Sequence, residues 1–378
     1  MFLFRNSGKN RQSLDSIVSK IGYVIPKKLR VDSYILPNET GSIKRRHKIL
    51  KKVFQQHKPP IFIGRHMGSG GFAEVYSATS DYDGVQDFAI KILREDLLQI
   101  RKGKQYNPTE EEMRVKEVKK RFKNESYVQW DLSKNVSDNI ANSVVPVYDH
   151  GEFDSKHEFR FILMERMDMT LRNYIKDSHE SPDTPRCKIQ LMIKIAEKLS
   201  NVHKEGIFHR DIKPENILFS KGKSPRSVCR DCDGKSCGLD VRIGDFGTVR
   251  WMKSYTDKYD AVIIGSQFYM SPEQILNPKN MDKRTDIYSF GIICYELLHR
   301  VHPKNLDEHS SNFLEKLAYE KPRERTPPQG YELLQKIINK CMNERWSRYQ
   351  NMEELLCDLR GFLKEKISED REISGSKV

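Results

Sequence analysis

The sequence predicts an α+β protein with two lobes, a small lobe built on an antiparallel sheet with one helix and a larger, mainly helical lobe. Short apolar runs bounded by glycine-bearing turns predict strands over residues 61–67, 73–78, 87–93, 144–148 and 159–165. Beyond Leu171, apolar residues recur at helical spacing and predict helices over residues 188–203, 283–298, 331–342 and 352–363. A strand-rich part followed by a helix-rich part indicates two lobes with a cleft between them.

One long helix interrupts the strands of the first lobe. Apolar residues at Val115, Val118, Phe122 and Trp130 repeat through the charged stretch 110–132. This spacing gives the helix a single inward face.

Composition places the chain in the soluble globular class, with 37% hydrophobic and 31% charged residues among 378. Its apolar runs are far shorter than a membrane span, and the apolar start Met1–Phe4 meets Arg5 too early for a secretory signal. We therefore expect a cytoplasmic protein. Seven cysteines, an odd number in a domain of this size, favour reduced thiols over a disulfide framework.

The positive charge is concentrated at the start of the chain. Residues 1–60 hold 14 Lys and Arg against three acidic residues, out of a net charge of +13. They are predicted to form a basic extension with two short helices, whose apolar faces dock on the main domain of residues 61–365, followed by a tail of residues 366–378. The alternative is a basic surface for membrane lipid or an acidic partner. Because the rest of the chain is nearly neutral, no nucleic-acid partner is expected.

A glycine-rich stretch is the first candidate for nucleotide binding. Glycines between Gly68 and Val75 would let the backbone approach phosphate oxygens closely. The stretch also fits a dinucleotide-binding pattern, but that pattern requires a helix after the turn, and residues 74–78 are typical of a strand. Further on, Lys91 places an ammonium in the middle of a strand, where it needs an anion such as ATP phosphate.

Two later motifs carry the chemistry of phosphoryl transfer. The first is His209-Arg210-Asp211-Ile212-Lys213-Pro214-Glu215-Asn216, and the second is Asp245-Phe246-Gly247. Phosphoryl transfer needs a carboxylate to orient the attacking hydroxyl, cations to offset charge, and oxygen ligands for magnesium. These motifs supply each of those groups.

From about Ile61 to Leu363 the chain resembles the eukaryotic-type serine/threonine protein kinases, because several separate motifs occur in the family's order. The resemblance implies the bilobal protein-kinase fold, with lobes at residues 61–165 and 168–365, and the transfer of the γ-phosphoryl group of Mg-ATP to serine or threonine hydroxyls of protein substrates. It implies that Asp211 is the catalytic base, that Lys213 lies beside the γ-phosphate, and that Asn216 and Asp245 bind Mg²⁺, for which Mn²⁺ is a possible substitute.

The resemblance also assigns the nucleotide contacts. Lys91 would hold the α- and β-phosphates and pair with a helix glutamate, which we take to be Glu125, on the inward face, with Glu117 as the alternative. The loop over the phosphates would contain Met67, Gly68, Ser69, Gly70, Gly71 and Phe72. The adenine would contact Val75, Ala89, Met164, Glu165, Met167 and Leu218.

Further family positions concern structure and regulation. Asp286 and the pair Glu273 with Arg348 are expected to hold the second lobe together. Arg210 would pair with a phosphate on the activation segment, for which autophosphorylation at Thr256 is the first candidate. Ser266 stands where many of these kinases have threonine.

The sequence departs from the family pattern in three places. Ala73 replaces the third glycine of the loop, and the interval from Lys91 to Glu125 is long, so residues 94–115 are expected to be an insertion or a helix extension. Residues 220–240 are expected to be a second insertion, which contains Cys229, Cys232 and Cys237. A zinc site is not expected there because the local sequence provides no fourth ligand. We expect a hairpin loop with reduced thiols instead.

Two other classes of function remain open at this point. A pseudokinase or nucleotide-binding scaffold would bind ATP without turnover, but such proteins usually lack one of the groups present here. A small-molecule kinase is disfavoured by the long segment from Gly247 to Glu273, which in the family docks peptide. The histidines His203 and His209 are expected to have structural roles.

Overall fold

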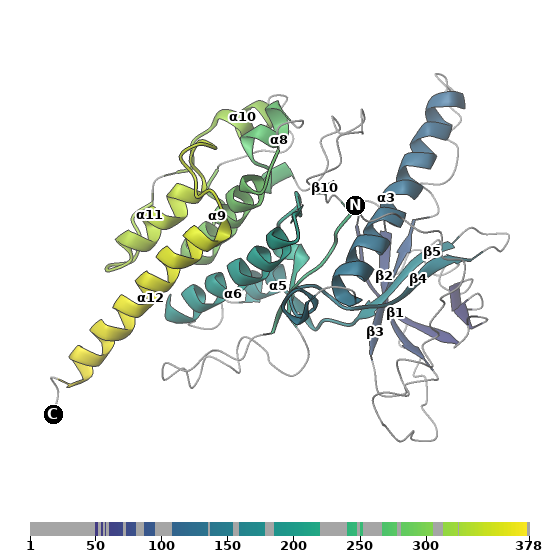
Figure 1. Ribbon diagram of the computed structural model, residues 1–378, viewed down its shortest axis with the longest axis horizontal. Coiled ribbons are helices and arrows are strands. Elements are labelled where there is room, and N and C mark those ends of the chain that lie inside the picture. The colour runs from purple at the N-terminus through teal and green to yellow at the C-terminus, as the bar shows by residue number, and fades with distance from the viewer. Residues whose placement is uncertain are drawn as a thin grey trace. The chain divides into compact units, whose positions relative to one another are not determined.

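The computed structural model describes residues 50–51, 54–55, 57, 60–70, 73–80, 87–94, 108–134, 137–153, 159–177, 185–219, 240–247, 250–251, 267–277, 281–304, 313–323 and 325–375. The described residues divide into two compact units (Figure 1). The sheet unit comprises those up to Val118 together with 147–166, and the helical unit comprises those of 119–146 and from Met167 onward. The predicted α+β class is confirmed, since one unit is an antiparallel sheet and the other is mainly helical.

The sheet unit contains five antiparallel strands in the order β1-β2-β3-β5-β4. Their bounds are β1 Ile61–Ser69, β2 Ala73–Ser80, β3 Phe88–Leu93, β4 Val147–Phe153 and β5 Phe159–Glu165. Strand β3 is central and pairs through Lys91 with Val75 of β2 and Ile162 of β5. Its neighbours Ile90 and Ile92 are fully buried, so the sheet holds Lys91 between two rigid apolar positions.

Residues just before the first strand complete the core of the sheet unit. Leu50 and Phe54 are fully buried in the same apolar cluster as Ile61, Tyr76 and Phe161. The rings of Phe54 and Phe161 meet edge to face with centroids 5.2 Å apart. Leu50 and Phe54, two of the residues that predicted the second helix of the basic extension, are thus packed in the core of the sheet unit, whereas residues 1–49 lie outside the described part of the chain.

The strand predicted over residues 144–148 is wrong at its start, because β4 begins at Val147. Val144 instead forms an isolated parallel bridge with Ile243, and the Val145 N–H donates to the Ile243 carbonyl at 2.9 Å. Pro146, which has no N–H to donate, separates that contact from β4.

The helical unit combines helices with two small β ladders, β6-β8-β9 and β10-β7. Helix α3, Pro108–Lys134, crosses the division between the units. The other elements are α4 Asp138–Ala141, β6 Met169–Thr170, α5 Leu171–Asp177, α6 Pro185–Lys204, β7 Ile207–Phe208, η3 Pro214–Asn216, β8 Ile217–Phe219, β9 Val241–Ile243, β10 Arg250–Trp251, η4 Gln267–Tyr269, α8 Pro272–Leu276, α9 Arg284–His299, α10 Phe313–Tyr319, α11 Glu332–Cys341 and α12 Met352–Gly375.

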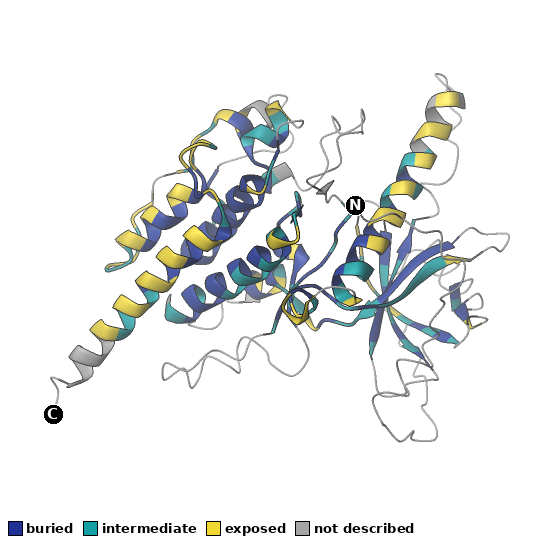
Figure 2. Ribbon diagram, in the orientation of Figure 1, coloured by how far each residue is buried: buried dark blue, intermediate teal, exposed yellow. Residues whose placement is uncertain are grey.

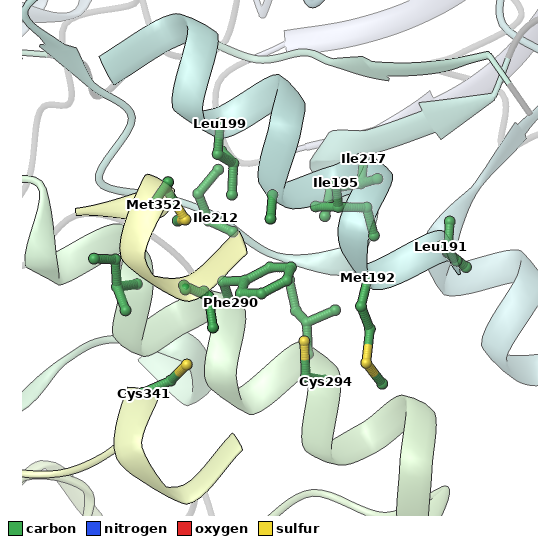
Figure 3. Packing of buried hydrophobic residues seen from close by; sticks show 14 of the residues in the cluster. Leu191, Met192, Ile195, Leu199, Ile212, Ile217, Phe290, Cys294, Cys341 and Met352 are labelled. Atoms are coloured by element: carbon green, nitrogen blue, oxygen red, sulfur yellow. The ribbon is translucent and has the colours of Figure 1, made fainter. Parts of the chain in front are cut away.

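Helix α9 is the centre of the helical unit. Every residue from Arg284 to Leu298 is buried, as the dark ribbon of Figure 2 shows. Figure 3 shows Phe290 of α9 among side chains of other segments, including Ile212 and Met352. Because buried residues cover every side of α9, the helix is stable only inside a core.

Helix α12 is longer than predicted, since it continues from Leu363 to Gly375. The apolar pattern ends near Leu363, but the following residues are mostly good helix formers. The pair Lys366–Glu369, 2.6 Å apart at a spacing of three residues, adds local support. Within the described ranges, no helix has the length and apolarity required to cross a membrane.

We predict opposite effects of two glycine-to-alanine substitutions in helices. A Cβ at Gly291 of α9 would lie 2.6 Å from the Cβ of Cys341 on α11, so Gly291→Ala should lower the free energy of unfolding by about 1–3 kcal/mol. On α12, nothing lies within 4 Å of a Cβ at Gly361, and Gly361→Ala should raise it by about 0.5–1 kcal/mol. Urea unfolding of both variants measures the difference, and equal gains would contradict the packing described for α9 and α11.

Candidate active site

Three of the predicted site residues meet where the loop after β7 leads into η3: Asp211 and Lys213 lie in the loop, and Asn216 ends η3. The Nζ of Lys213 lies 2.7 Å from Oδ2 of Asp211. Asn216 donates from Nδ2 to the backbone carbonyl of Asp211 at 2.8 Å, and its Nδ2 lies 3.4 Å from Oδ2 of the same residue. The Asp211 and Lys213 side chains are only 10% and 16% exposed, so their charges interact more strongly than they would in water.

A buried carboxylate fixes the backbone of residues 209–216, the segment predicted to be catalytic and therefore named the catalytic loop. Asp286, fully buried in the first turn of α9, accepts the N–H groups of His209 and Arg210, each at 2.8 Å. His203 of α6 contacts the same carboxylate through Nε2 at 2.8 Å. Burial alone would raise the pKa of Asp286, but the hydrogen bond from His203 and the nearby charges and donors lower it. Arg210 adopts a left-handed conformation with φ of 69°, which these bonds hold in place.

His209 joins the catalytic loop to the second motif. Its Nδ1 accepts the N–H of Asp211 at 3.3 Å, so its Nε2 donates to the Gly244 carbonyl at 2.9 Å. Its ring also packs against Phe246, with centroids 4.9 Å apart. The structure therefore places Asp245, which has φ of 61°, on a segment bonded to the catalytic loop.

Glu125 of α3 lies close to the second motif. A Cβ built at Gly247 would be 3.3 Å from Oε2 of Glu125 and 3.4 Å from Oδ1 of Asp245, so both carboxylates border the same point. Glu125 is buried, whereas Glu117 is partly exposed. Helix α3 is anchored nearby, since Gln129 donates from Nε2 to the Val145 carbonyl at 3.0 Å. Two carboxylates so close together favour a cation beside them.

The donors at this place suit a magnesium ion. Asp245 and Asn216 offer a carboxylate and an amide oxygen, and Mg²⁺ binds through one or two such protein groups together with phosphates and water. Among the residues that the structure describes, no group of three or more His, Cys, Asp or Glu side chains could hold a metal ion by itself. The three cysteines considered for zinc, Cys229, Cys232 and Cys237, lie outside those residues.

The sheet unit carries the other predicted nucleotide contacts. Gly68 pairs with Val75 across the turn from β1 to β2, and Gly70 donates its N–H to the Ala73 carbonyl at 2.8 Å, so the predicted loop closes between two strands. Met67 and Ser69 lie at the end of β1, whereas Gly71 and Phe72 are not among the described residues. The strand after the turn excludes the dinucleotide-binding alternative, which needs a helix.

The residues predicted to contact adenine are divided between the units. In the sheet unit, buried Ala89 pairs with Met164, next to partly exposed Glu165. In the helical unit, Met167 is buried, and Leu218 of β8 packs so closely on Gly244 that a Cβ there would lie 2.9 Å from its Cδ1. Sequence reasoning missed the role of Gly244, although its position directly before Asp245 was the available signal.

Comparison with known proteins is consistent with this geometry. The family model for the protein kinase domain matches residues 62–358. The chain belongs to the protein kinase family. PrkC of Bacillus subtilis, a serine/threonine-protein kinase, is 30% identical over 313 residues, which cover 81% of this chain and 41% of the relative. PknL of Mycobacterium tuberculosis, also a serine/threonine-protein kinase, is 34% identical over 198 residues, covering 51% and 44%. This kinase chain spans less than half the length of these relatives.

A buried ion pair joins α8 of the kinase's helical unit to the segment between α11 and α12. Arg348 reaches Glu273 of α8 at 2.6 and 3.0 Å, and donates from Nε to the Asn343 carbonyl at 2.7 Å. Burial favours a higher pKa for Glu273, but the hydrogen bond and charge of Arg348 lower it. Arg210 lies nearby, because its carbonyl accepts the side-chain amide of Gln274 at 2.8 Å. The predicted regulatory residues Thr256 and Ser266 lie outside the described ranges.

We predict that the Arg348 pair contributes far more to stability than an exposed pair of the same kind. Arg348→Met should lower the free energy of unfolding by about 3–5 kcal/mol, because it leaves the Glu273 carboxylate buried without its cation. The matched control is Arg360→Met, which breaks the exposed pair with Glu197 and should cost less than about 1 kcal/mol. Denaturant unfolding compares the two, and similar losses would contradict this role for Arg348.

Proposed function

We propose that this kinase transfers the γ-phosphoryl group of Mg-ATP to serine or threonine hydroxyls of proteins. The observation that carries the proposal is the convergence of Asp211, Lys213 and Asn216 in one loop that is bonded, through His209, to the segment of Asp245. The names of the relatives support serine and threonine as acceptors.

Each side chain has a distinct role in the proposed reaction. Asp211 orients the attacking hydroxyl and accepts its proton, while the ammonium of Lys213, 2.7 Å from that carboxylate, offsets negative charge on the transferred group. Asn216 and Asp245 supply oxygen ligands to Mg²⁺, which neutralises the phosphate charges when bound. In the sheet unit, Lys91 binds the α- and β-phosphates, and Glu125 is its proposed partner.

The first test removes the carboxylate of Asp211. Asp211→Asn should lower the rate of phosphate transfer by about 10²–10⁴-fold, because an amide of the same shape cannot accept the hydroxyl proton. Transfer from radiolabelled ATP to a generic basic protein measures the rate, and phosphoamino-acid analysis identifies the acceptor. The variant should keep its circular dichroism spectrum and its affinity for ATP.

Three results would reject the proposal. Labelling that survives Asp211→Asn contradicts the role of the carboxylate, and ATP binding by the wild type without any transfer supports a nucleotide-binding scaffold. A labelled metabolite with unlabelled protein would instead indicate a small-molecule kinase.

Autophosphorylation is a second prediction of the proposed function. The wild type, purified after expression and not treated with phosphatase, should carry phosphate between Gly247 and Glu273, with Thr256 and Ser266 as candidates and Arg210 as the proposed partner of the phosphate. Mass spectrometry before and after phosphatase locates it. The modification should be absent from Asp211→Asn, and its presence there would point to another kinase in the expression host. The cytoplasmic location and a contact of residues 1–60 with lipid or an acidic partner stay predictions.

A further inference from the structure

Four side chains from four separate segments form a charged cluster beside the catalytic loop. They are Arg172 of α5, Glu215 of η3, Tyr269 of η4 and Glu296 of α9, and we call them the Arg172 cluster. All of them belong to the helical unit. The proposed catalytic roles use none of these residues.

Arg172 is the centre of the cluster. Its Nε donates to Oε1 of Glu215 at 2.8 Å, its Nη2 donates to the hydroxyl of Tyr269, and its Nη1 lies 3.7 Å from Oε2 of Glu296. Tyr269 in turn lies 3.0 and 2.8 Å from the two carboxylate oxygens of Glu296. One guanidinium thus contacts two carboxylates and a phenol. Arginine can do this because its guanidinium is planar and has several N–H donors.

The cluster has one open edge and one buried edge. The side chain of Glu215 is 46% exposed and that of Arg172 is 26% exposed, whereas that of Glu296 is 8% exposed. Burial raises the pKa of Glu296, and burial together with Glu296 raises that of Tyr269. Burial alone would lower the pKa of Arg172, but its three partners together raise it, so Arg172 keeps its charge.

The exposed side of the cluster is close in sequence to the proposed catalytic base. Glu215 follows Lys213 by two residues and Asp211 by four, within the loop that positions the attacking hydroxyl. Tyr269 lies three residues after Ser266, a candidate for the regulatory phosphate, and three before Pro272, where α8 begins. On the proposed function, a peptide that brings its hydroxyl to Asp211 would have neighbouring residues within reach of Glu215 and of Arg172, which is bonded to Glu215.

We propose that Arg172 is a specificity-determining residue that fills the acidic site formed by Glu215 and Glu296, so that the kinase gains nothing from a basic residue next to the acceptor hydroxyl. This inference rests on the proposed function. Arg172 occupies Oε1 of Glu215 and, together with Tyr269, the carboxylate of Glu296. A peptide arginine could take over these contacts only by displacing Arg172, which exchanges one ion pair for an equivalent one. The positive charge of Arg172 also repels an approaching cation, and such repulsion is a common source of specificity.

Removing the guanidinium of Arg172 should give the kinase a preference for peptides with an arginine near the acceptor hydroxyl. In Arg172→Ala, two carboxylates remain beside the loop, and a peptide arginine would supply the missing charge. Arg172→Gln tests the same point with less disturbance, since its amide can still donate to Tyr269 or Glu215. In the double variant Arg172→Ala/Glu215→Gln, the gain should be lost again. Arg360→Ala, which removes an exposed guanidinium on α12, is the matched control.

The experiment compares pairs of serine peptides. The two peptides of a pair are identical except at one position near the acceptor serine, where one has arginine and the other has glutamine, and a separate pair is made for each flanking position. For the wild type and Arg360→Ala, the ratio of kcat/KM for the arginine peptide over its glutamine partner should be close to one at every position. For Arg172→Ala and Arg172→Gln, the ratio should rise about tenfold at one position or more, mainly through KM. A purely structural role would lower kcat/KM for both peptides and leave their ratio unchanged.

Two outcomes overturn the inference: a wild type that already prefers arginine about tenfold, or a ratio that stays the same in the Arg172 variants. Fluorescence anisotropy of the labelled peptides gives the same ratio from binding alone. If the wild type binds peptides but transfers no phosphate, the proposed function fails while the binding ratio still decides the role of Arg172. If transfer occurs with a constant ratio, only the inference about Arg172 fails.

Discussion

The carboxylate of Asp286 holds the catalytic loop by its backbone, and the geometry of the candidate site depends on this contact. Because the N–H groups of His209 and Arg210 converge on one buried anion, the side chains of Asp211 and Lys213 start from a fixed main chain. The buried anion is tolerated because His203 and the two amides supply donors to its oxygens. Asp286 itself is fixed by α9, which is enclosed on all sides by the core of the helical unit.

The segments that make the site rigid are therefore different from the segments that carry its polar side chains. Buried residues of α9 provide the fixed reference, while short segments with little regular structure, from Arg210 to Lys213 and from Gly244 to Gly247, carry the polar groups. His209 connects them, so that the main chain at Asp211 and the main chain just before Asp245 belong to one hydrogen-bonded network. A similar division occurs in the sheet unit, where the paired strands β2, β3 and β5 hold Lys91 in register.

Much of this was predictable from the sequence, because the signals are local. Periodicity alone placed Glu125 on the inward face of α3, and the strand position of Lys91 follows from alternation. Non-local pairing caused the error at β4, since no local feature shows that Val144 bonds with Ile243. The end of α12 was missed because its last turns have helix-forming residues but no apolar face. The Arg172 cluster joins α5 to α9 and could not be seen before the chain was folded.

The backbone conformation of Arg210 and Asp245 lowers the stability of the folded protein, and this has a consequence for evolution and engineering. Both occupy left-handed backbone without being glycine, at roughly 1–2 kcal/mol each. Glycine would relieve the main chain at either position but would delete the guanidinium or the carboxylate. Consensus or thermostabilising redesign is therefore blocked at these two positions, and extra stability has to come from distant surfaces such as the outer face of α12.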